Sequence, residues 1–246
     1  MSVGCLLPTG SAARAYMDIK TPRRTRERIL QSSLRLFNEL GEPHVTTTTI
    51  ADEMSISSGN LYYHFRNKDD IITHLFLVFE KEIETRLSDG GAEAPSMEAV
   101  AQHLGELMEF AWSYRFLYRD MNEILARNRT LEARFKRLIG LTGEFASRLC
   151  VRLVASGDMQ ASDAELARIA TNAAVLATYW LSYQFALNPR SYNDIAQIRA
   201  ELHRGGQQML SLLAPYLRGA ARQAYARLVS PAAAAPPFSA SAPESR

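Results

Sequence analysis

Apolar residues recur at helical spacing along nearly the whole chain, and this periodicity limits the possible folds more than any other feature. Between Ile71 and Ile83, for example, apolar side chains return every three or four residues, at positions 71, 72, 75, 76, 79 and 83. This spacing places them on one face of an α-helix. No segment shows the sustained alternation of a β-strand, and the one β-branched run, residues 45–50, consists mostly of threonine. We therefore expect an all-α protein.

Composition separates a central region from two ends of a different character. The chain has 246 residues, of which 47% are hydrophobic, so it can bury a sizeable core in one large or two smaller domains. Residues 1–20 suggest a flexible arm, and residues 229–246, rich in proline, alanine and serine, predict a disordered tail. Glycines and a proline between Ser88 and Pro95 predict a connection. We thus expect one domain over residues 21–87 and a larger one over 88–228.

Capping residues predict where several helices begin and end. Thr21 and Pro22 are typical of a helix start, and Gly41 is the natural stop for that helix. Asn67 followed by Asp70 resembles a capping box that opens another helix. In the larger domain we expect helices at 97–112, 114–127, 130–156, 161–187 and 191–218, broken by Gly157-Asp158, by Asn188-Pro189 and by weaker polar turns.

Residues 46–65, TTTTIADEMSISSGNLYYHF, are the most informative segment. One short helix begins after Thr46, a tight turn follows at Ser55-Ile56, and Ser57 caps a second short helix. The residues expected to point inward are Ile50, Ala51, Met54, Ile56, Leu61 and Phe65. Two short helices with so short a connection must cross steeply, as in a helix-turn-helix.

The start of the second helix, residues 57–60, carries only small side chains, so a DNA backbone or base edge can approach it closely. Asn60 can bond an adenine edge with two hydrogen bonds. The spacing alone fits equally well a capped turn between core helices, with aromatic residues that only pack.

This segment resembles the DNA-binding domain of the TetR (tetracycline repressor) family over residues 24–83. The positions that match the family pattern are Thr46, Ile50, Ala51, Ile56, Ser57, Gly59, Leu61, Tyr62, His64, Phe65 and Lys68. The resemblance implies an N-terminal three-helix helix-turn-helix domain and a larger C-terminal helical domain for dimerisation and ligand binding. One departure is Ser55, which stands where the family has glycine in the turn.

The resemblance also implies a function. The protein would be a sequence-specific transcriptional regulator, a ligand-responsive repressor that binds a pseudo-palindromic double-stranded DNA operator as a homodimer. The family's DNA contacts correspond here to Thr46, Thr48, Ser57, Ser58, Asn60, Tyr62, His64 and Lys68. Two alternatives remain open: an effector-independent or architectural DNA-binding protein, and a helical enzyme or interaction scaffold.

The charge distribution fits a local contact with nucleic acid. The formal net charge is only +2, but the six basic residues between positions 14 and 28 face only two acids, Asp18 and Glu27. By itself this segment would suggest a solvated helix face or a disordered arm. Next to a helix-turn-helix, this basic segment is suited to binding DNA.

Small residues in the larger domain suggest a dimer interface. Ala173 and Ala177 lie in one expected helix, and Gly205 and Gly206 lie inside another, where each glycine costs roughly 1 kcal/mol unless a close contact compensates. Pairing of these helices with those of a second copy would give a four-helix interface. A crossing within one chain is the alternative.

Aromatic residues concentrate in the same domain and suggest a pocket for a small apolar or aromatic effector. The candidate lining and anchoring residues are His103, Trp112, Arg115, Asn122, Tyr179, Trp180, Tyr183 and Gln184. Each of them alone is more often a surface or core residue than a ligand contact.

Motifs of catalysis are absent from the sequence: it has no P-loop, dinucleotide-binding glycine pattern, zinc-protease motif or nucleophile elbow. Its two cysteines, Cys5 and Cys150, lack metal-ligand spacing. We therefore expect no enzyme activity, cofactor or metal. The cysteine pattern and the lack of an 18-residue apolar run favour a cytoplasmic protein with no membrane contact.

Overall fold

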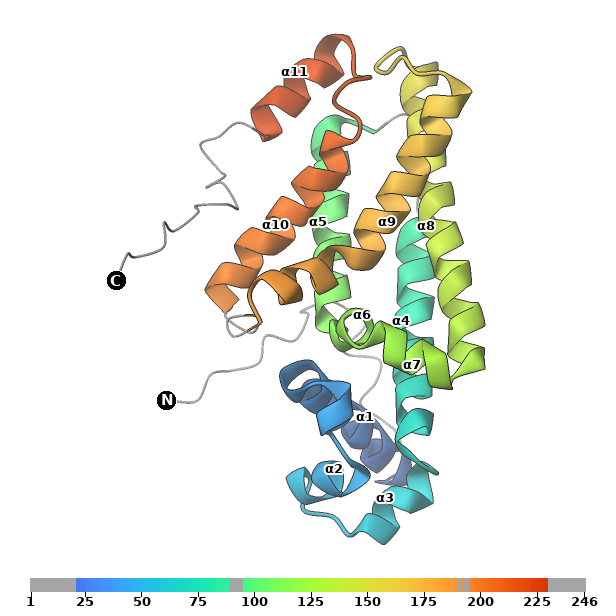
Figure 1. Cartoon of the computed structure of the whole chain (residues 1–246), viewed down its shortest axis with the longest axis vertical. Coiled ribbons are helices and arrows are strands. Elements are labelled where there is room, and N and C mark those ends of the chain that lie inside the picture. Colours follow the sequence, from blue (N-terminus) through green and yellow to red (C-terminus); the bar gives the residue numbers. More distant parts are fainter. Residues whose placement is uncertain (1–20, 89–94, 190–191, 193–194, 230–246) are drawn as a thin grey trace, which may run out of the picture. The chain divides into compact units, whose positions relative to one another are not determined.

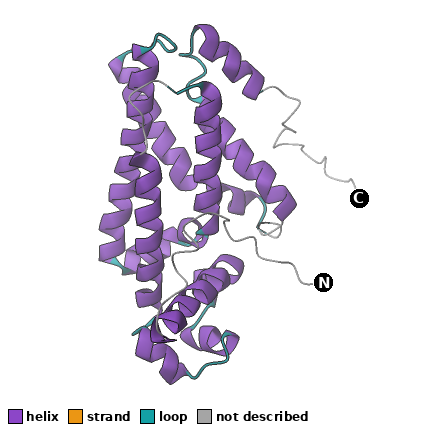
Figure 2. Ribbon diagram, turned by 180° about the vertical axis from the view of Figure 1, so that it is seen from behind, coloured by secondary structure: helices purple, strands orange, loops and turns teal. Residues whose placement is uncertain are grey.

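The computed structural model describes residues 21–88, 95–189, 192 and 195–229 (Figure 1). These residues are largely helical (Figure 2), and they contain no β-strand, only an isolated bridge between Met159 and Leu217. The all-α prediction is confirmed. The predicted arm, the predicted tail apart from Val229, and most of the predicted connection at Ser88–Pro95 lie outside the described residues. No helix in the described ranges is both long and apolar enough to cross a membrane.

The chain forms two compact units that meet between Leu75 and Phe76, inside helix α4 (Lys68–Ser88). The first unit contains α1 (Thr21–Leu40), the 3-10 helix η2 (Glu42–His44), α2 (Thr47–Glu53), α3 (Ser58–His64) and the start of α4. Gly41 ends α1 with a φ of 95°, and its N–H donates to the carbonyl of Phe37 at 3.0 Å. The side chain of Asn67 accepts the N–H of Asp70 at 2.8 Å at the start of α4. Both predicted caps are confirmed.

Five of the six residues predicted to point inward in the helix-turn-helix are buried in the first unit, and the sixth, Ile56, is half-buried. Ile50, Ala51, Met54, Leu61 and Phe65 are all at most 8% exposed. The guanidinium of Arg26 lies 4.8 Å from the ring centre of Phe65 and covers that ring. This core fixes which faces of α2 and α3 are left outside.

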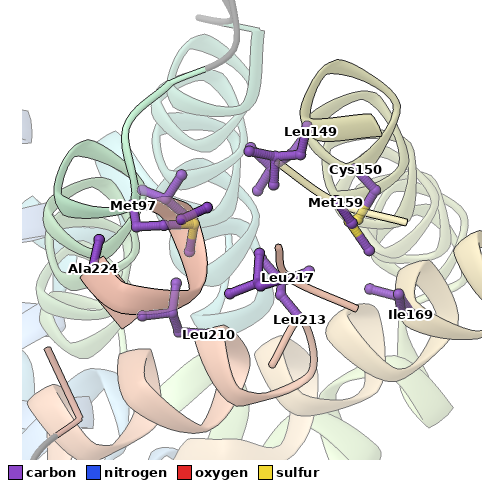
Figure 3. Packing of buried hydrophobic residues seen from close by; sticks show 12 residues of the cluster. Met97, Leu149, Cys150, Met159, Ile169, Leu210, Leu213, Leu217 and Ala224 are labelled. Atoms are coloured by element: carbon purple, nitrogen blue, oxygen red, sulfur yellow. The ribbon is translucent and has the colours of Figure 1, made fainter. Parts of the chain in front are cut away.

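The second unit consists of the rest of α4 and seven further helices in the described residues. They are α5 (Met97–Ser113), α6 (Phe116–Arg119), α7 (Met121–Arg127), α8 (Arg129–Ala155), α9 (Asp163–Leu187), α10 (Ile195–Ser211) and α11 (Gly219–Leu228). Helices α8 and α9 pack along each other, α10 packs on α5 and α9, and α11 packs on α5. The ends of α5, α8, α9 and α10, together with α11, enclose an apolar cluster that includes Met97, Leu149, Leu210 and Leu217 (Figure 3).

Two predicted helices of this unit need correction. The helix expected over 114–127 is divided at Asp120 into α6 and α7. The helix expected over 191–218 ends at Ser211, and α11 then begins at Gly219. Pro215 explains the second break, because proline has no N–H to donate and disfavours helical geometry at the residue before it.

Ionic contacts join α4 to α8 within the second unit. Glu80 is 4% exposed and its carboxylate pairs with Arg134 and, at 3.4 Å, with Arg137. Arg137 also pairs with Glu84. The Arg148 guanidinium donates to the carbonyl of Leu87 at 2.9 Å. We call the ion pairs of Glu80 and Glu84 with Arg134 and Arg137 the α4–α8 ion ladder.

Candidate DNA-binding face and ligand cavity

Hydroxyl caps define the starts of α2 and α3. The Thr46 hydroxyl accepts the N–H of Thr49 at 3.0 Å, and the Ser57 hydroxyl accepts the N–H of Asn60 at 3.1 Å. Each cap satisfies an N–H that the first turn of a helix leaves without a partner. The predicted helix starts are therefore confirmed.

The turn between the two helices is tight and left-handed at Ser55, whose φ is 53°. The N–H of Ile56 donates to the carbonyl of Ala51 at 3.0 Å, and the N–H of Ser55 donates to that of Asp52 at 3.0 Å. This pair of bonds is the Schellman arrangement, in which glycine usually takes the left-handed position. The departure noted in the sequence thus places serine in a conformation that favours glycine.

Helix α3 turns its small and polar residues outward. Leu61 is fully buried, whereas Ser57, Ser58, Gly59 and Asn60 are all exposed. The next outward residues are aromatic, Tyr62 at 52% and Tyr63 at 80% exposure. A short helix with a small, polar and accessible start can approach base edges in a DNA groove.

Four of the eight predicted DNA contacts already use their polar atoms inside the unit. Thr46 and Ser57 act as caps, and the Tyr62 hydroxyl lies 3.0 Å from that of Thr47. The ammonium of Lys68 lies 2.7 Å from a carboxylate oxygen of Glu42 and also donates to that residue's carbonyl at 3.0 Å. The Glu42 side chain is completely buried, so Lys68 has a structural role that the sequence did not suggest.

The other four predicted contacts are uncommitted or only packed. The side chains of Thr48, Ser58 and Asn60 are exposed and make no hydrogen bond with any described residue. The His64 ring packs edge-on against Tyr63 at 5.1 Å. Thr48, Ser58 and Asn60 therefore have their donors and acceptors available to a partner.

The second unit contains an apolar cavity of about 100 Å³. Helices α4, α5, α6, α8, α9 and α10 all contribute to its wall. The residues that line it include Phe79, Ile83, Leu107, Met108, Tyr118, Phe135, Leu138, Thr142, Phe145, Ala173, Ala177 and Thr178. Sequence reasoning missed most of these, because a buried side chain facing a cavity looks the same in sequence as one facing a filled core.

None of the ligand residues predicted from the sequence lines this cavity. The set is His103, Trp112, Arg115, Asn122, Tyr179, Trp180, Tyr183 and Gln184. Asn122 is exposed on α7, and Tyr179 and Tyr183 are exposed by 50% and 41%. Arg115 stacks over the Trp112 ring at 4.4 Å.

Three members of that set lie near a cavity without lining the large one. Trp112 and Gln184 line a second, smaller cavity of about 30 Å³. The His103 ring packs at 5.3 Å against Phe145, which lines the large cavity, and its Nε2 is buried with no hydrogen-bond partner among the described residues.

The residues predicted for the dimer interface make close contacts within the chain. Gly205 is covered by Trp180, and a Cβ at this glycine would lie 2.5 Å from the indole nitrogen. That nitrogen donates to the carbonyl of Glu201 at 3.1 Å. Gly206 faces Leu104 of α5, while Ala173 and Ala177 line the large cavity. The alternative of a crossing within one chain accounts for both glycines.

A different surface of the second unit is apolar and exposed. On α9, Val175, Tyr179, Tyr183 and Leu187 recur at intervals of four residues and are 40–52% exposed. On α8, Val151 and Val154 are 53% and 37% exposed. Sequence reasoning did not identify this α8–α9 face, because α9 is apolar around most of its circumference.

Among the described residues, no group of three or more histidine, cysteine or acidic side chains is arranged to hold a metal ion. The Cys150 thiol is buried, and burial raises its pKa to about 11. It is therefore protonated at neutral pH, which makes it a poor nucleophile.

Comparison with known proteins identifies the family of both units. A family profile described as bacterial regulatory proteins of the tetR family matches residues 29–75, and one described as a bacterial transcriptional repressor matches residues 78–225. Among solved structures, a TetR-family transcriptional regulator from Marinobacter aquaeolei is 31% identical, with a TM-score of 0.73, and the match covers 83% of this chain and 96% of that one. A complex of SmeT with triclosan, 21% identical with a TM-score of 0.51, shares the fold over 80% of this chain and 94% of that one.

Curated relatives match over shorter stretches. HbdR of Aromatoleum sp., an HTH-type transcriptional regulator, is 30% identical over 105 residues, 42% of this chain and 43% of the relative. AcrR of Shigella flexneri is 32% identical over 59 residues, 24% of this chain and 27% of the relative. The chain thus matches less than half the length of either relative, whereas the repressor profile alone extends over more than half of the chain. With its helix-turn-helix and larger helical unit, the chain belongs to the TetR family of bacterial transcriptional regulators.

Proposed function

We propose that the protein is a repressor that binds a double-stranded DNA operator as a homodimer and that a small apolar effector controls this binding. The observation that carries the proposal is the exposed start of α3, where Ser58 and Asn60 have uncommitted polar atoms. Thr48 on α2 adds a third exposed hydroxyl. Such a regulator acts in the cytoplasm, where bacterial DNA lies.

Asn60 provides the sharpest test of DNA recognition. A side-chain amide that bonds a base edge with two hydrogen bonds contributes about 1–3 kcal/mol of discrimination at one base pair. Operator sequences are first selected from genomic fragments bound by the wild-type protein. Asn60→Ala should then lose affinity chiefly for operators with the wild-type base at one position in each half-site.

The matched control is Asn122→Ala, which removes an exposed asparagine from α7 of the other unit. It should leave affinity and base preference unchanged. If Asn60→Ala weakened binding to all operators equally, Asn60 would contact the DNA backbone and would not recognise a base. No sequence preference in the wild-type protein would refute the proposed function.

We assign the dimer contact to the α8–α9 face in place of the glycines. A short recognition helix reads only a few base pairs, so useful specificity needs two copies, spaced about 34 Å per turn of DNA. Val151, Val175, Tyr179 and Tyr183 are exposed large side chains of the kind that two identical copies cover by pairing.

Val175→Glu tests this surface by placing a charge on it. Burial of an unpaired carboxylate opposes association, so the variant should be monomeric at micromolar concentration and should lose operator binding. Val78→Glu is the matched control, since Val78 is 49% exposed on α4 and Val175 is 52% exposed on α9. Sedimentation velocity measures the oligomeric state of both variants. A wild-type protein that is monomeric, or a Val175→Glu variant that remains dimeric, would contradict the assignment.

The cavity is the proposed effector site. Helix α4 contributes Phe79, Ile83 and Leu87 to its wall, and the same helix begins at Lys68 in the helix-turn-helix unit. An occupant of the cavity thus contacts the helix that continues into the DNA-binding unit. SmeT, which shares the fold, has been solved in complex with triclosan.

Linkage makes the effector role measurable. If an effector weakens operator binding by some factor, the operator must weaken effector binding by the same factor. Calorimetric titration of a candidate, with and without saturating operator, compares the two affinities. Equal affinities for every molecule that binds the cavity would leave a DNA-binding regulator without an effector.

A further inference from the structure

The wall of the large cavity carries no charged side chain among the described residues. Twenty-four residues line it, and all of them are aliphatic, aromatic, methionine, threonine or cysteine. Transfer of an isolated carboxylate or ammonium from water into such surroundings is strongly unfavourable. The wall therefore selects against charged molecules.

The polar groups of the wall are few and differ in what they offer. The hydroxyl of Thr142 donates to the carbonyl of Leu138 at 3.0 Å, and that of Thr178 donates to the carbonyl of Ala174 at 2.7 Å. Their protons are used, so these two threonines present only acceptor lone pairs.

Tyr118 is the polar residue of the wall with a free donor. Its ring packs edge-on against Phe79 at 6.0 Å and against Phe135 at 6.4 Å, and both of these residues line the cavity. Its hydroxyl makes no hydrogen bond with any described residue. Burial raises the pKa of this phenol well above its usual value, so it stays protonated and can donate at any physiological pH.

The size of the cavity limits the ligand further. Its volume of about 100 Å³ is somewhat below the roughly 150 Å³ of an engineered apolar cavity that binds benzene. The cavity volume is therefore of the order that suits a molecule with about one ring.

We propose that this cavity binds an uncharged molecule of about one aromatic ring, with an oxygen that accepts a hydrogen bond from the Tyr118 hydroxyl. The inference rests on the proposed function only where the cavity is called an effector site. Binding itself is a property of the free protein and is tested without DNA.

The test uses four probes with one ring and different substituents: benzyl alcohol, toluene, benzoate and benzylammonium. Each is titrated into the full-length wild-type protein at neutral pH, and binding is measured by calorimetry. Benzyl alcohol should bind most tightly, toluene about fivefold more weakly, and the two ions at least tenfold more weakly than the alcohol. Benzoate or benzylammonium binding as tightly as benzyl alcohol would overturn the proposal, as would no saturable binding of any probe.

Tyr118→Phe tests the hydrogen bond and the location together. It removes one oxygen and keeps the ring that packs on Phe79 and Phe135, so it should weaken benzyl alcohol about fivefold and leave toluene unchanged. Tyr225→Phe, which removes a hydroxyl from a half-buried tyrosine of α11 that does not line the cavity, should change neither. An unchanged affinity for benzyl alcohol in Tyr118→Phe, or an equal loss for both probes, would overturn the assignment of Tyr118.

Operator binding separates this inference from the proposed function. If benzyl alcohol binds as expected but leaves operator affinity unchanged, the ligand class stands and the effector role of this ligand fails. If the neutral probes do not bind while α3 still binds an operator, the ligand class fails and DNA recognition stands.

Discussion

Replacement of Ser55 by glycine should stabilise the helix-turn-helix. Ser55 has a φ of 53°, and the Schellman bonds on either side hold it there. A left-handed conformation costs a residue with a side chain roughly 1–2 kcal/mol, whereas glycine adopts it freely. Glycine also increases the conformational entropy of the unfolded chain, which lowers the free energy of unfolding by about 0.4–1 kcal/mol. The Ser55 side chain is exposed and bonds no described residue, so its removal loses no contact. The net gain should be about 0.5–1 kcal/mol.

Hydrogen exchange is the right assay, because the chain contains two units and a single global unfolding transition is not assured. The amides of Met54 and Leu61 donate within α2 and at the start of α3, so they report on this turn. In Ser55→Gly their exchange should slow by about threefold, which corresponds to about 0.6 kcal/mol.

Ser58→Gly is the matched control. Ser58 is also exposed, but it is the first residue of α3, where glycine weakens a helix by up to about 1 kcal/mol. Exchange should therefore become faster in this variant. If Ser55→Gly also accelerated exchange at Met54 and Leu61, the turn would not be strained by serine and the reasoning would be refuted.

Three further predictions concern buried contacts. Gly205→Ala should destabilise the second unit by about 1–3 kcal/mol, because the new Cβ would meet the Trp180 indole, and Trp180→Phe should recover part of this loss in thermal denaturation. Lys68→Met should destabilise the first unit by about 3 kcal/mol by removing the cation beside buried Glu42, so hydrogen exchange there should accelerate even without DNA; unchanged exchange would favour a role in DNA binding alone. Glu80→Gln should weaken the α4–α8 ion ladder, and faster exchange in the C-terminal half of α4 should follow; no change would show that apolar packing alone holds this helix.

Local signals made the helix-turn-helix predictable. Thr46 and Ser57 each cap a helix through an N–H three residues further on, so the interaction is visible as a short sequence spacing. Gly41 ends α1 for an equally local reason, its positive φ. Burial of Leu61 followed from the spacing of apolar residues within a few turns. Such features depend on neighbours along the chain, which a sequence displays directly.

Contacts between distant segments were not predictable in the same way. Lys68 meets Glu42 across 26 positions, and no spacing in the sequence reveals this pair. Gly205 requires close packing, as its position inside a helix suggested, but the sequence does not say that Trp180 of the same chain supplies the contact. Tyr179 and Thr178 are neighbours on α9, yet one is exposed and the other lines the cavity.

The cavity and the α4–α8 ion ladder act on the same pair of helices. Phe79 and Ile83 of α4 and Phe135 and Leu138 of α8 line the cavity, while Glu80, next to Phe79, pairs with arginines of α8. A molecule that enters the cavity therefore contacts both helices that the ladder joins. It can shift α4 only if it binds one spacing of these helices better than the other. The ion pairs, the ring-sized space and the start of α4 in the helix-turn-helix unit are the observations from which we propose the α4–α8 spacing as the variable that an effector would change.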